Sequence, residues 1–146
     1  MPVVIFDLYR TLYDPDKDAL LPGVIDTLQR LKDAGMRLYV VTRDEGNRSD
    51  ILLRLQIRDF FHGVLLVPSK SREVFQPLCA SAGEVYVIGD RIKEEILYGN
   101  QCKAKTIWFK NGKFASEGPS VTGEEPWRTV TNMSEIVPII LKEPLG

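Results

Sequence analysis

Hydrophobic residues occur in short unbroken runs at regular intervals along the chain. A run of apolar, β-prone residues without a polar position predicts a strand that is covered on both faces. Such runs lie at 3–6, 63–67 and 85–88, and mainly apolar stretches that also predict strands lie at 36–41 and 105–109. Buried strands are therefore predicted from the N-terminal residues to the last third of the sequence.

Between these runs, apolar residues return at intervals of three and four, which places them on one face of a helix. Val24, Leu28 and Leu31 show this spacing ahead of Gly35, a residue type that often ends a helix. The same pattern predicts helices over 47–56, from 71 to a stop at Gly83, over 92–98 with Gly99 as its end, and from a capping box at Asn132 and Glu135 to Leu141.

Strands and helices alternate throughout, which predicts a three-layer α/β/α sandwich, Rossmann-like, with a parallel sheet of about five strands. Right-handed crossovers then bring the carboxyl ends of the strands to one edge of the sheet. The 116–126 segment, rich in Gly, Pro, Ser and Glu, predicts an irregular loop, and a short extension is expected at 129–130. The length of 146 residues and the absence of a linker predict a single domain over 1–146.

Composition narrows the classes of partner and chemistry. A net charge of −1 makes nucleic acid an unexpected partner. The sequence has neither a signal-peptide pattern nor an apolar run of about 18 residues, so no membrane span is expected. Cys79 and Cys102 lack metal-site spacing and are expected to be buried free thiols, which predicts a cytoplasmic location. A single histidine argues against imidazole catalysis.

Polar residues follow four of the predicted strands: Asp7, Thr42, Lys70 and Asp90. Each has an ordinary explanation alone, since an Asp can cap a turn and a Lys near a helix start is usually solvated. Together at one sheet edge they indicate phosphoryl transfer. A carboxylate attacks phosphorus, Mg²⁺ joins the two acids, and Lys and Thr hold the phosphoryl oxygens.

Four motifs in this order resemble those of the haloacid dehalogenase-like (HAD) hydrolase superfamily. The first motif of that family is an apolar strand followed by Asp-x-Asp-x-Thr, and residues 6–12, Phe-Asp-Leu-Tyr-Arg-Thr-Leu, match it except at the second Asp. Residues 39–42 are similar to the second motif and Lys70 to the lysine of the third. Residues 85–96, with Gly-Asp and later acidic residues, are similar to the fourth. The resemblance covers nearly the whole chain.

The resemblance implies roles for the matching positions. Asp7 would be the nucleophile and a Mg²⁺ ligand, with Asp90 as a second ligand and the backbone carbonyl of Tyr9 as a third. Thr42 and Lys70 would bind the phosphoryl group, and Lys70 would also neutralise Asp7.

The later acidic position of the fourth motif has two candidates. Glu95 would be the further metal ligand, and Glu94 is the alternative in the neighbouring register. Arg10, Thr11 and Arg43 adjoin the motif residues and are candidate substrate-binding residues.

Tyr9 is the main departure from the family's catalytic set. In family phosphatases the Asp at this position protonates the leaving group and later activates water. A phenol with a pKa of about 10 cannot do this at neutral pH. Losing a positioned general acid–base costs roughly 10²–10⁴ in rate. We therefore expect a slow or specialised Mg²⁺-dependent phosphatase or phosphotransferase that forms an aspartyl phosphate on Asp7. The alternative is a non-catalytic HAD-fold binding module.

Asp-x-Tyr-x-Thr at 7–11 also resembles the opening of the 2-haloacid dehalogenases of the same superfamily, which need no metal. Those enzymes carry a helical cap after the first motif, whereas a short segment separates Asp14 from the helix predicted at Val24. Gly89-Asp90 instead favours a Mg²⁺ site. Without a cap, the expected substrate is a phosphorylated small molecule or the phosphorylated end of a macromolecule. A second copy of the chain is an expected means of closing the open site.

Overall fold

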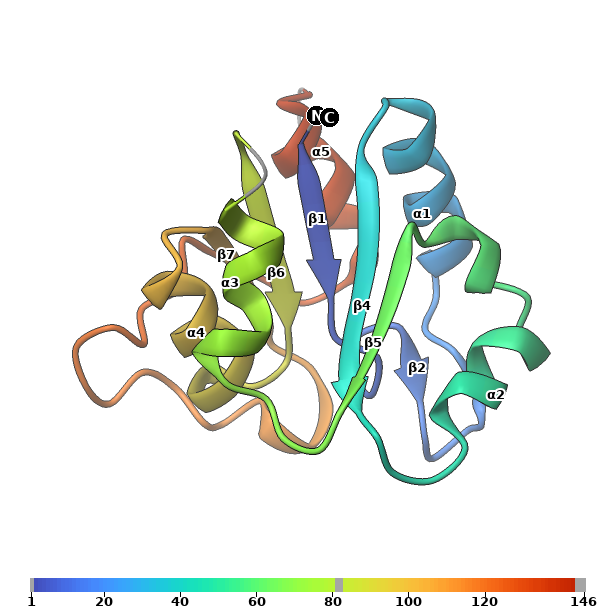
Figure 1. The fold of residues 1–146 in the computed structure, drawn as a ribbon, viewed down its shortest axis with the longest axis horizontal. Coiled ribbons are helices and arrows are strands. Elements are labelled where there is room, and N and C mark those ends of the chain that lie inside the picture. The colour runs from blue at the N-terminus through green and yellow to red at the C-terminus, as the bar shows by residue number, and fades with distance from the viewer. Residues whose placement is uncertain (1, 81–82, 144–146) are drawn as a thin grey trace.

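A parallel sheet of six strands forms the centre of the molecule (Figure 1). The computed structural model describes residues 2–80 and 83–143. In sheet order the strands are β5 (Gly63–Val67), β4 (Arg37–Arg43), β1 (Val3–Phe6), β6 (Val85–Gly89), β7 (Lys105–Phe109) and β8 (Arg128–Val130). Every neighbouring pair runs parallel, so the predicted Rossmann-like fold is confirmed.

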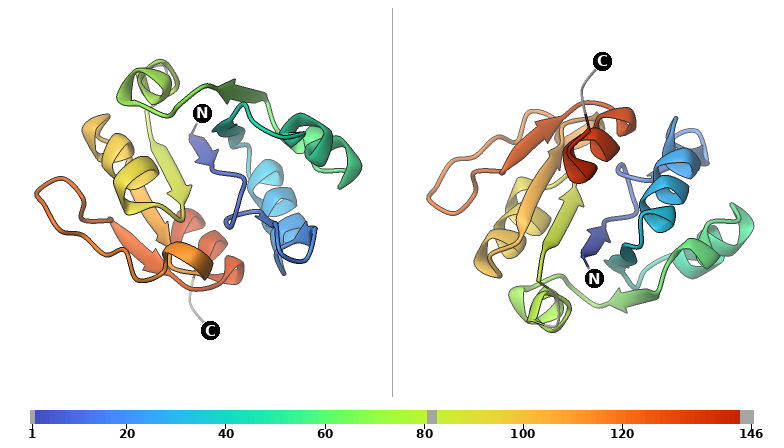
Figure 2. Two further views of the ribbon diagram at one scale, coloured as in Figure 1. Left: turned by 90° about the horizontal axis from the view of Figure 1, so that it is seen from below. Right: turned by 90° about the horizontal axis from the view of Figure 1, so that it is seen from above.

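Helices cover both faces of this sheet and complete three layers (Figure 2). They are α1 (Val24–Asp33), α2 (Arg48–Arg54), α3 (Arg72–Ala80), α4 (Leu97–Gln101) and α5 (Ile136–Leu141). Apolar residues of α1, α2 and α5 share one core with the sheet, and those of α3 and α4 share another on the opposite face.

The side chains of β1 divide between these two cores. Val4 and Phe6 pack in the core with α1 and α5, and Val3 and Ile5 pack in the core beneath α3. Successive strand residues point to opposite faces, so a central strand needs apolar residues at every position. All four side chains are buried, which explains the unbroken apolar run in the sequence.

Several elements differ from the sequence-based prediction. The short extension expected at 129–130 is a sixth strand, β8, paired with β7. Strand β4 continues through Thr42 and Arg43 instead of ending at residue 41. The helix expected to end at Gly99 continues to Gln101, so that prediction was wrong. Gly99 is needed for close packing, because a Cβ atom there would lie 2.7 Å from Cγ2 of Thr106.

The other helix ends largely follow the sequence. Gly35 follows Ala34, the C-cap of α1, and adopts a positive φ of 86°, as expected of a terminating glycine. Asn132 and Glu135 form the predicted capping box, which leads through a 3₁₀ turn into α5. Helix α2 is shorter than predicted, and the end expected for α3 falls partly at 81–82, outside the described residues.

The segment between β1 and α1 contains a small antiparallel hairpin of β2 (Tyr13–Asp14) and β3 (Ala19–Leu20). Cys79 and Cys102 are free and partly buried. Among the helices of the described residues, none has the length and apolar character needed to cross a bilayer.

Candidate active site

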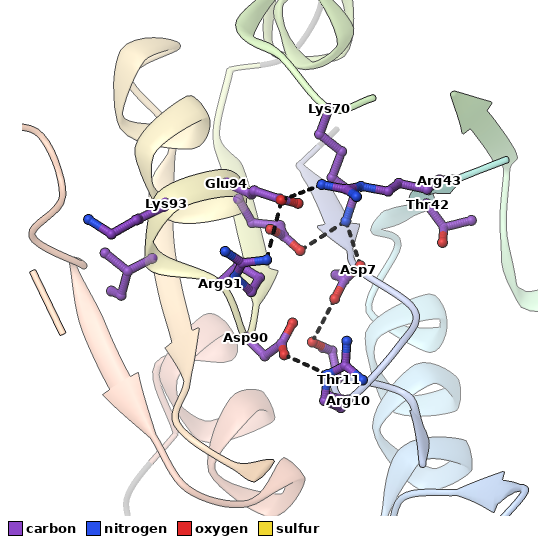
Figure 3. A network of polar contacts seen from close by, with 12 residues as sticks. Asp7, Arg10, Thr11, Thr42, Arg43, Lys70, Asp90, Arg91, Lys93 and Glu94 are labelled. Carbon is purple, nitrogen blue, oxygen red and sulfur yellow. Dashed lines mark hydrogen bonds and ion pairs between the residues drawn. The ribbon is translucent and has the colours of Figure 1, made fainter. Parts of the chain in front are cut away.

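The carboxyl edge of the sheet brings together the polar residues that follow its strands (Figure 3). β1 lies between β4 and β6, with Phe6 in register with Val40 and Ile88. The backbone N–H of Asp7 continues this pairing by donating to the carbonyl of Ile88 at 3.0 Å. Asp7 therefore leaves the central strand at a fixed position, between the ends of two neighbouring strands.

Lys70 joins Asp7 to a second acid. Its ammonium Nζ donates to Asp7 Oδ1 at 2.5 Å and to Glu95 Oε1 at 2.9 Å, and all three side chains are at most 5% exposed. Burial alone would raise the pKa of Asp7, but the adjacent Lys70 charge and hydrogen bonds lower it below its ordinary value. Burial alone would lower the pKa of Lys70, but the two carboxylates raise it. Thr11 also donates to Asp7, at 3.4 Å.

Asp7, Asp90 and Glu95 form a cluster in which one oxygen from each lies within 4.8 Å of the others. Burial and the neighbouring Asp7 charge raise the pKa of Asp90 to about 9 and that of Glu95 to about 8. Lys70 and the Arg10 guanidinium beside Asp90 do not balance three carboxylates, so ionisation of the whole cluster requires additional positive charge.

The donor set fits a divalent cation. Mg²⁺ is a hard cation that prefers oxygen ligands, and it is usually bound by one or two carboxylates together with waters and substrate phosphate oxygens. Glu95 Oε2 is buried without a hydrogen-bond partner among the described residues, so it is free to bind a cation. Asp7, Asp90 and Glu95 would hold the ion. The carbonyl of Tyr9 stays a prediction as a further ligand.

The structure distinguishes Glu95 from Glu94. Residues 92–96 form a π-helical turn that begins one residue after Asp90, and this turn directs Glu95 inward over Gly89. Glu94 instead lies at the rim, where it accepts from Arg43 at 2.7 Å and from Arg91 at 3.4 Å. Of the two registers left open by the sequence, only Glu95 joins the acid cluster.

Arg10 adopts a positive φ of 63° and turns its side chain toward the acids. Its Nε lies 3.3 Å from Asp90 Oδ2, so the guanidinium partly neutralises this carboxylate. Arg10 and Arg43 both line the cavity above the acids, as do Arg91 and Lys113. Arg91 and Arg10 also lie over the ring of Phe114, at 3.9 and 5.1 Å from its centroid.

The cavity has a volume of about 210 Å³, small for a ligand site. The irregular segment at 116–126 supports its rim, because Glu117 accepts from Arg91 at 3.2 Å and from the backbone N–H of Ile92. This segment is irregular as predicted, and Glu117 anchors it to the start of the π-helical turn.

Arg48 is a site residue that the sequence analysis missed. It lines the cavity from α2, donates to Thr42 Oγ1 at 2.7 Å, and lies with its guanidinium carbon 3.8 Å from the centroid of the Tyr9 ring. Thr42 itself is fully buried. The Glu45-x-x-Arg48 spacing just after the second motif is the sequence feature that could have indicated Arg48. These two residues form an ion pair at 2.9 Å.

Comparison with solved structures identifies the fold. A HAD-superfamily hydrolase from Ehrlichia chaffeensis superposes with a TM-score of 0.72 at 16% identity, covering 97% of this chain and 96% of that one. A D,D-heptose 1,7-bisphosphate phosphatase from B. bronchiseptica, complexed with magnesium and phosphate, gives a TM-score of 0.69 at 14% identity, covering 99% and 100%. The chain therefore has the fold of the HAD-like hydrolases, the fold that its motifs predicted.

The sequence is similar to curated proteins that are named as phosphatases. It is 31% identical over 105 residues to a glyceraldehyde 3-phosphate phosphatase from Pyrococcus abyssi, which covers 64% of this chain and 43% of the relative. The chain spans about half the length of the curated relatives that it matches. No protein-family model matches it.

Proposed function

We propose that this protein is a Mg²⁺-dependent phosphatase or phosphotransferase that forms an aspartyl phosphate on Asp7. The observation that carries the proposal is the buried cluster in which Lys70 bridges Asp7 and Glu95, with Asp90 beside them. A buried, ionised carboxylate next to an ammonium and a cation-binding set is suited to attack an anionic phosphoryl group.

The chain's own residues would carry two steps. In the first, the Asp7 carboxylate attacks phosphorus, an acyl-phosphate bond forms, and the ester oxygen leaves and takes a proton from water. In the second, water attacks the acyl phosphate, which releases inorganic phosphate and restores Asp7. Lys70 would stabilise charge on the phosphoryl oxygens, and a bound Mg²⁺ would neutralise the remaining charge between the acids and the substrate.

Tyr9 would make both steps slow, because its phenol is a poor acid–base at neutral pH. Protonation of the leaving group and activation of water would then fall to solvent. The rate deficit expected for a missing general acid–base is roughly 10²–10⁴. Substrates with good leaving groups are therefore expected to react faster than alkyl phosphates.

The substrate we propose is a small phosphomonoester. The cavity volume of about 210 Å³ suits a phosphoryl group with a short carbon chain. Several curated relatives are named glyceraldehyde 3-phosphate phosphatases, which makes triose phosphates the first compounds to test. We further propose that 1–146 is one domain and acts in the cytoplasm, in keeping with its free thiols.

The test is a phosphomonoester screen with Mg²⁺ and with EDTA, including p-nitrophenyl phosphate and triose phosphates. We expect Mg²⁺-dependent phosphate release that Asp7→Asn abolishes. Asp26→Asn, an exposed change in the first turn of α1, serves as the matched control and should be unaffected. No release from any substrate would contradict an enzymatic function.

A second candidate, a non-catalytic module that binds a phosphorylated ligand, is favoured by one observation. The position that holds an acid–base group in family phosphatases is occupied by Tyr9, and its ring is stacked against Arg48. Phosphate binding without acyl-phosphate formation would support this candidate. The dehalogenase alternative would require halide release from 2-chloropropionate in the presence of EDTA.

A further inference from the structure

Arg48 and Glu95 share an unusual property. Among the described residues, buried side-chain atoms without a hydrogen-bond partner are Arg48 Nε, a donor, and Glu95 Oε2, an acceptor. Both residues line the same cavity. Unpaired buried polar atoms are costly and need an explanation, often a missing ligand. A bound cation would satisfy the unpaired acceptor, and an acceptor oxygen such as that of a phosphoryl group would satisfy the unpaired donor.

Arg48 is held in place from three directions. One terminal nitrogen donates to Thr42 Oγ1 at 2.7 Å, and the other donates to Glu45 Oε1 at 2.9 Å. The Tyr9 ring supports the guanidinium face at 3.8 Å. The side chain is only 10% exposed. A guanidinium stacked on an aromatic ring and fixed by two acceptors is oriented before any ligand arrives.

The burial of Thr42 changes how the second motif would meet a phosphoryl group. Thr42 is fully buried and its hydroxyl accepts from Arg48, whereas Arg48 lines the cavity. A ligand in the cavity therefore meets the guanidinium. A planar guanidinium retains several N–H donors after two are used, and its fork geometry matches phosphate oxygens.

We propose that Arg48 is the second cationic ligand of the phosphoryl group, beside Lys70, and that Tyr9 is the platform that positions it. This assignment gives Tyr9 a role that does not need proton transfer. Thr42 and Glu45 complete the support of the guanidinium. The proposal deepens the proposed function and rests on it, since it concerns the same phosphoryl site.

A platform role and an acid–base role for Tyr9 predict different effects of substitutions at this position. Tyr9→Phe keeps the ring and removes the hydroxyl, so a platform survives and an acid–base is lost. Tyr9→Leu removes the ring at similar bulk. Arg48→Met keeps the length of the side chain and removes its charge. Arg54→Met, on the same helix, is the matched control, because Arg54 pairs with Asp18 at the surface, 45% exposed.

The experiment measures binding of inorganic phosphate by calorimetry, with the full chain and Mg²⁺. We expect Arg48→Met to weaken binding about tenfold or more, as for loss of a charge-assisted hydrogen bond. Tyr9→Leu should also weaken phosphate binding, whereas Tyr9→Phe should bind phosphate like the unmodified protein. In the Arg48→Met background, Tyr9→Leu should cause little further loss of affinity. Thermal unfolding checks that each variant is folded.

Three outcomes would overturn the proposal. The phosphate affinity of Arg48→Met could equal that of Arg54→Met, the affinity of Tyr9→Phe could be as low as that of Tyr9→Leu, or the unmodified protein could fail to bind phosphate. The proposed function is judged separately on the same preparations, by turnover and acyl-phosphate formation. Phosphate binding that depends on Arg48 without turnover would support this inference and count against the enzyme.

Discussion

Glu95 folds back over Gly89 so closely that a Cβ atom at position 89 would lie 2.5 Å from the Cγ atom of Glu95. The glycine that precedes Asp90 is therefore required by the side chain that completes the acid cluster. Its role is steric: Gly89 belongs to β6 and has no positive φ, so backbone freedom is not what this position needs.

Substitution of Gly89 tests this relationship. Gly89→Ala should displace Glu95, weaken Mg²⁺ binding and destabilise the fold by about 1–3 kcal/mol, the usual cost of overpacking a core. Calorimetry and urea unfolding measure the two effects. Gly83→Ala, just before the same strand, has nothing within 4 Å of the added Cβ and is the control. Equal metal affinity in the two variants would show that the Gly89–Glu95 contact does not shape the site.

Substitutions of the two neighbouring glutamates should differ in their effect on Mg²⁺ affinity. Glu95→Gln removes a charge from the buried cluster and should weaken Mg²⁺ binding by about tenfold or more, as expected for a lost charge-assisted contact. Glu94→Gln removes a rim carboxylate that pairs with Arg43 and should change Mg²⁺ affinity little. Calorimetric titration with Mg²⁺ distinguishes them. The reverse order would place Glu94 in the metal site.

Arg10 should compete with the metal ion for Asp90. Its Nε lies 3.3 Å from Asp90 Oδ2, so a bound cation must share or displace this contact. Arg10→Gln is therefore expected to bind Mg²⁺ more tightly, whereas Arg30→Gln, whose partner Glu143 lies at the surface, should not. If Arg10→Gln binds Mg²⁺ more weakly, the arginine supports the metal site.

The acid cluster predicts how stability changes with pH in EDTA. Asp90 and Glu95 have pKa values raised from 3.8 to about 9 and from 4.5 to about 8, so the folded state holds protons that the unfolded chain has lost. Stability should therefore fall as pH rises between about 5 and 9. Mg²⁺ should reduce the fall, because it binds the ionised carboxylates.

Thermal unfolding across this pH range is the measurement. Glu95→Gln should flatten the profile in EDTA, because it removes one of the two groups with a raised pKa. A profile in EDTA that is level from about pH 5 to about pH 9 would contradict the assigned ionisation.

The sequence was informative where one local pattern fixes the outcome. Buried strands need apolar residues on both faces, so the runs at 3–6 and 85–88 identified β1 and β6 directly. The strand ends then identified Asp7 and Asp90 as neighbours, because parallel strands share one carboxyl edge. These two acids do belong to one cluster in the structure.

The sequence was less informative where long-range packing decides. A π-helical turn shifts the register of Glu94 and Glu95, and a regular helical period does not anticipate such a turn. In the sequence Gly99 has the position of a helix end, but in the structure it allows close packing against Thr106. The contact between Arg48 and Tyr9 joins α2 to the first motif and leaves no local pattern.

The most direct test of the account is covalent labelling of Asp7. The unmodified protein is mixed with Mg²⁺ and acetyl phosphate, a donor with a good leaving group, then quenched in acid and analysed by mass spectrometry. Because Tyr9 would leave water poorly activated, the acyl phosphate should accumulate. We expect one phosphoryl group on the peptide that contains Asp7, absent from Asp7→Asn and from samples in EDTA, and less abundant in Tyr9→Asp. An unlabelled Asp7 under these conditions would contradict the aspartyl-phosphate mechanism.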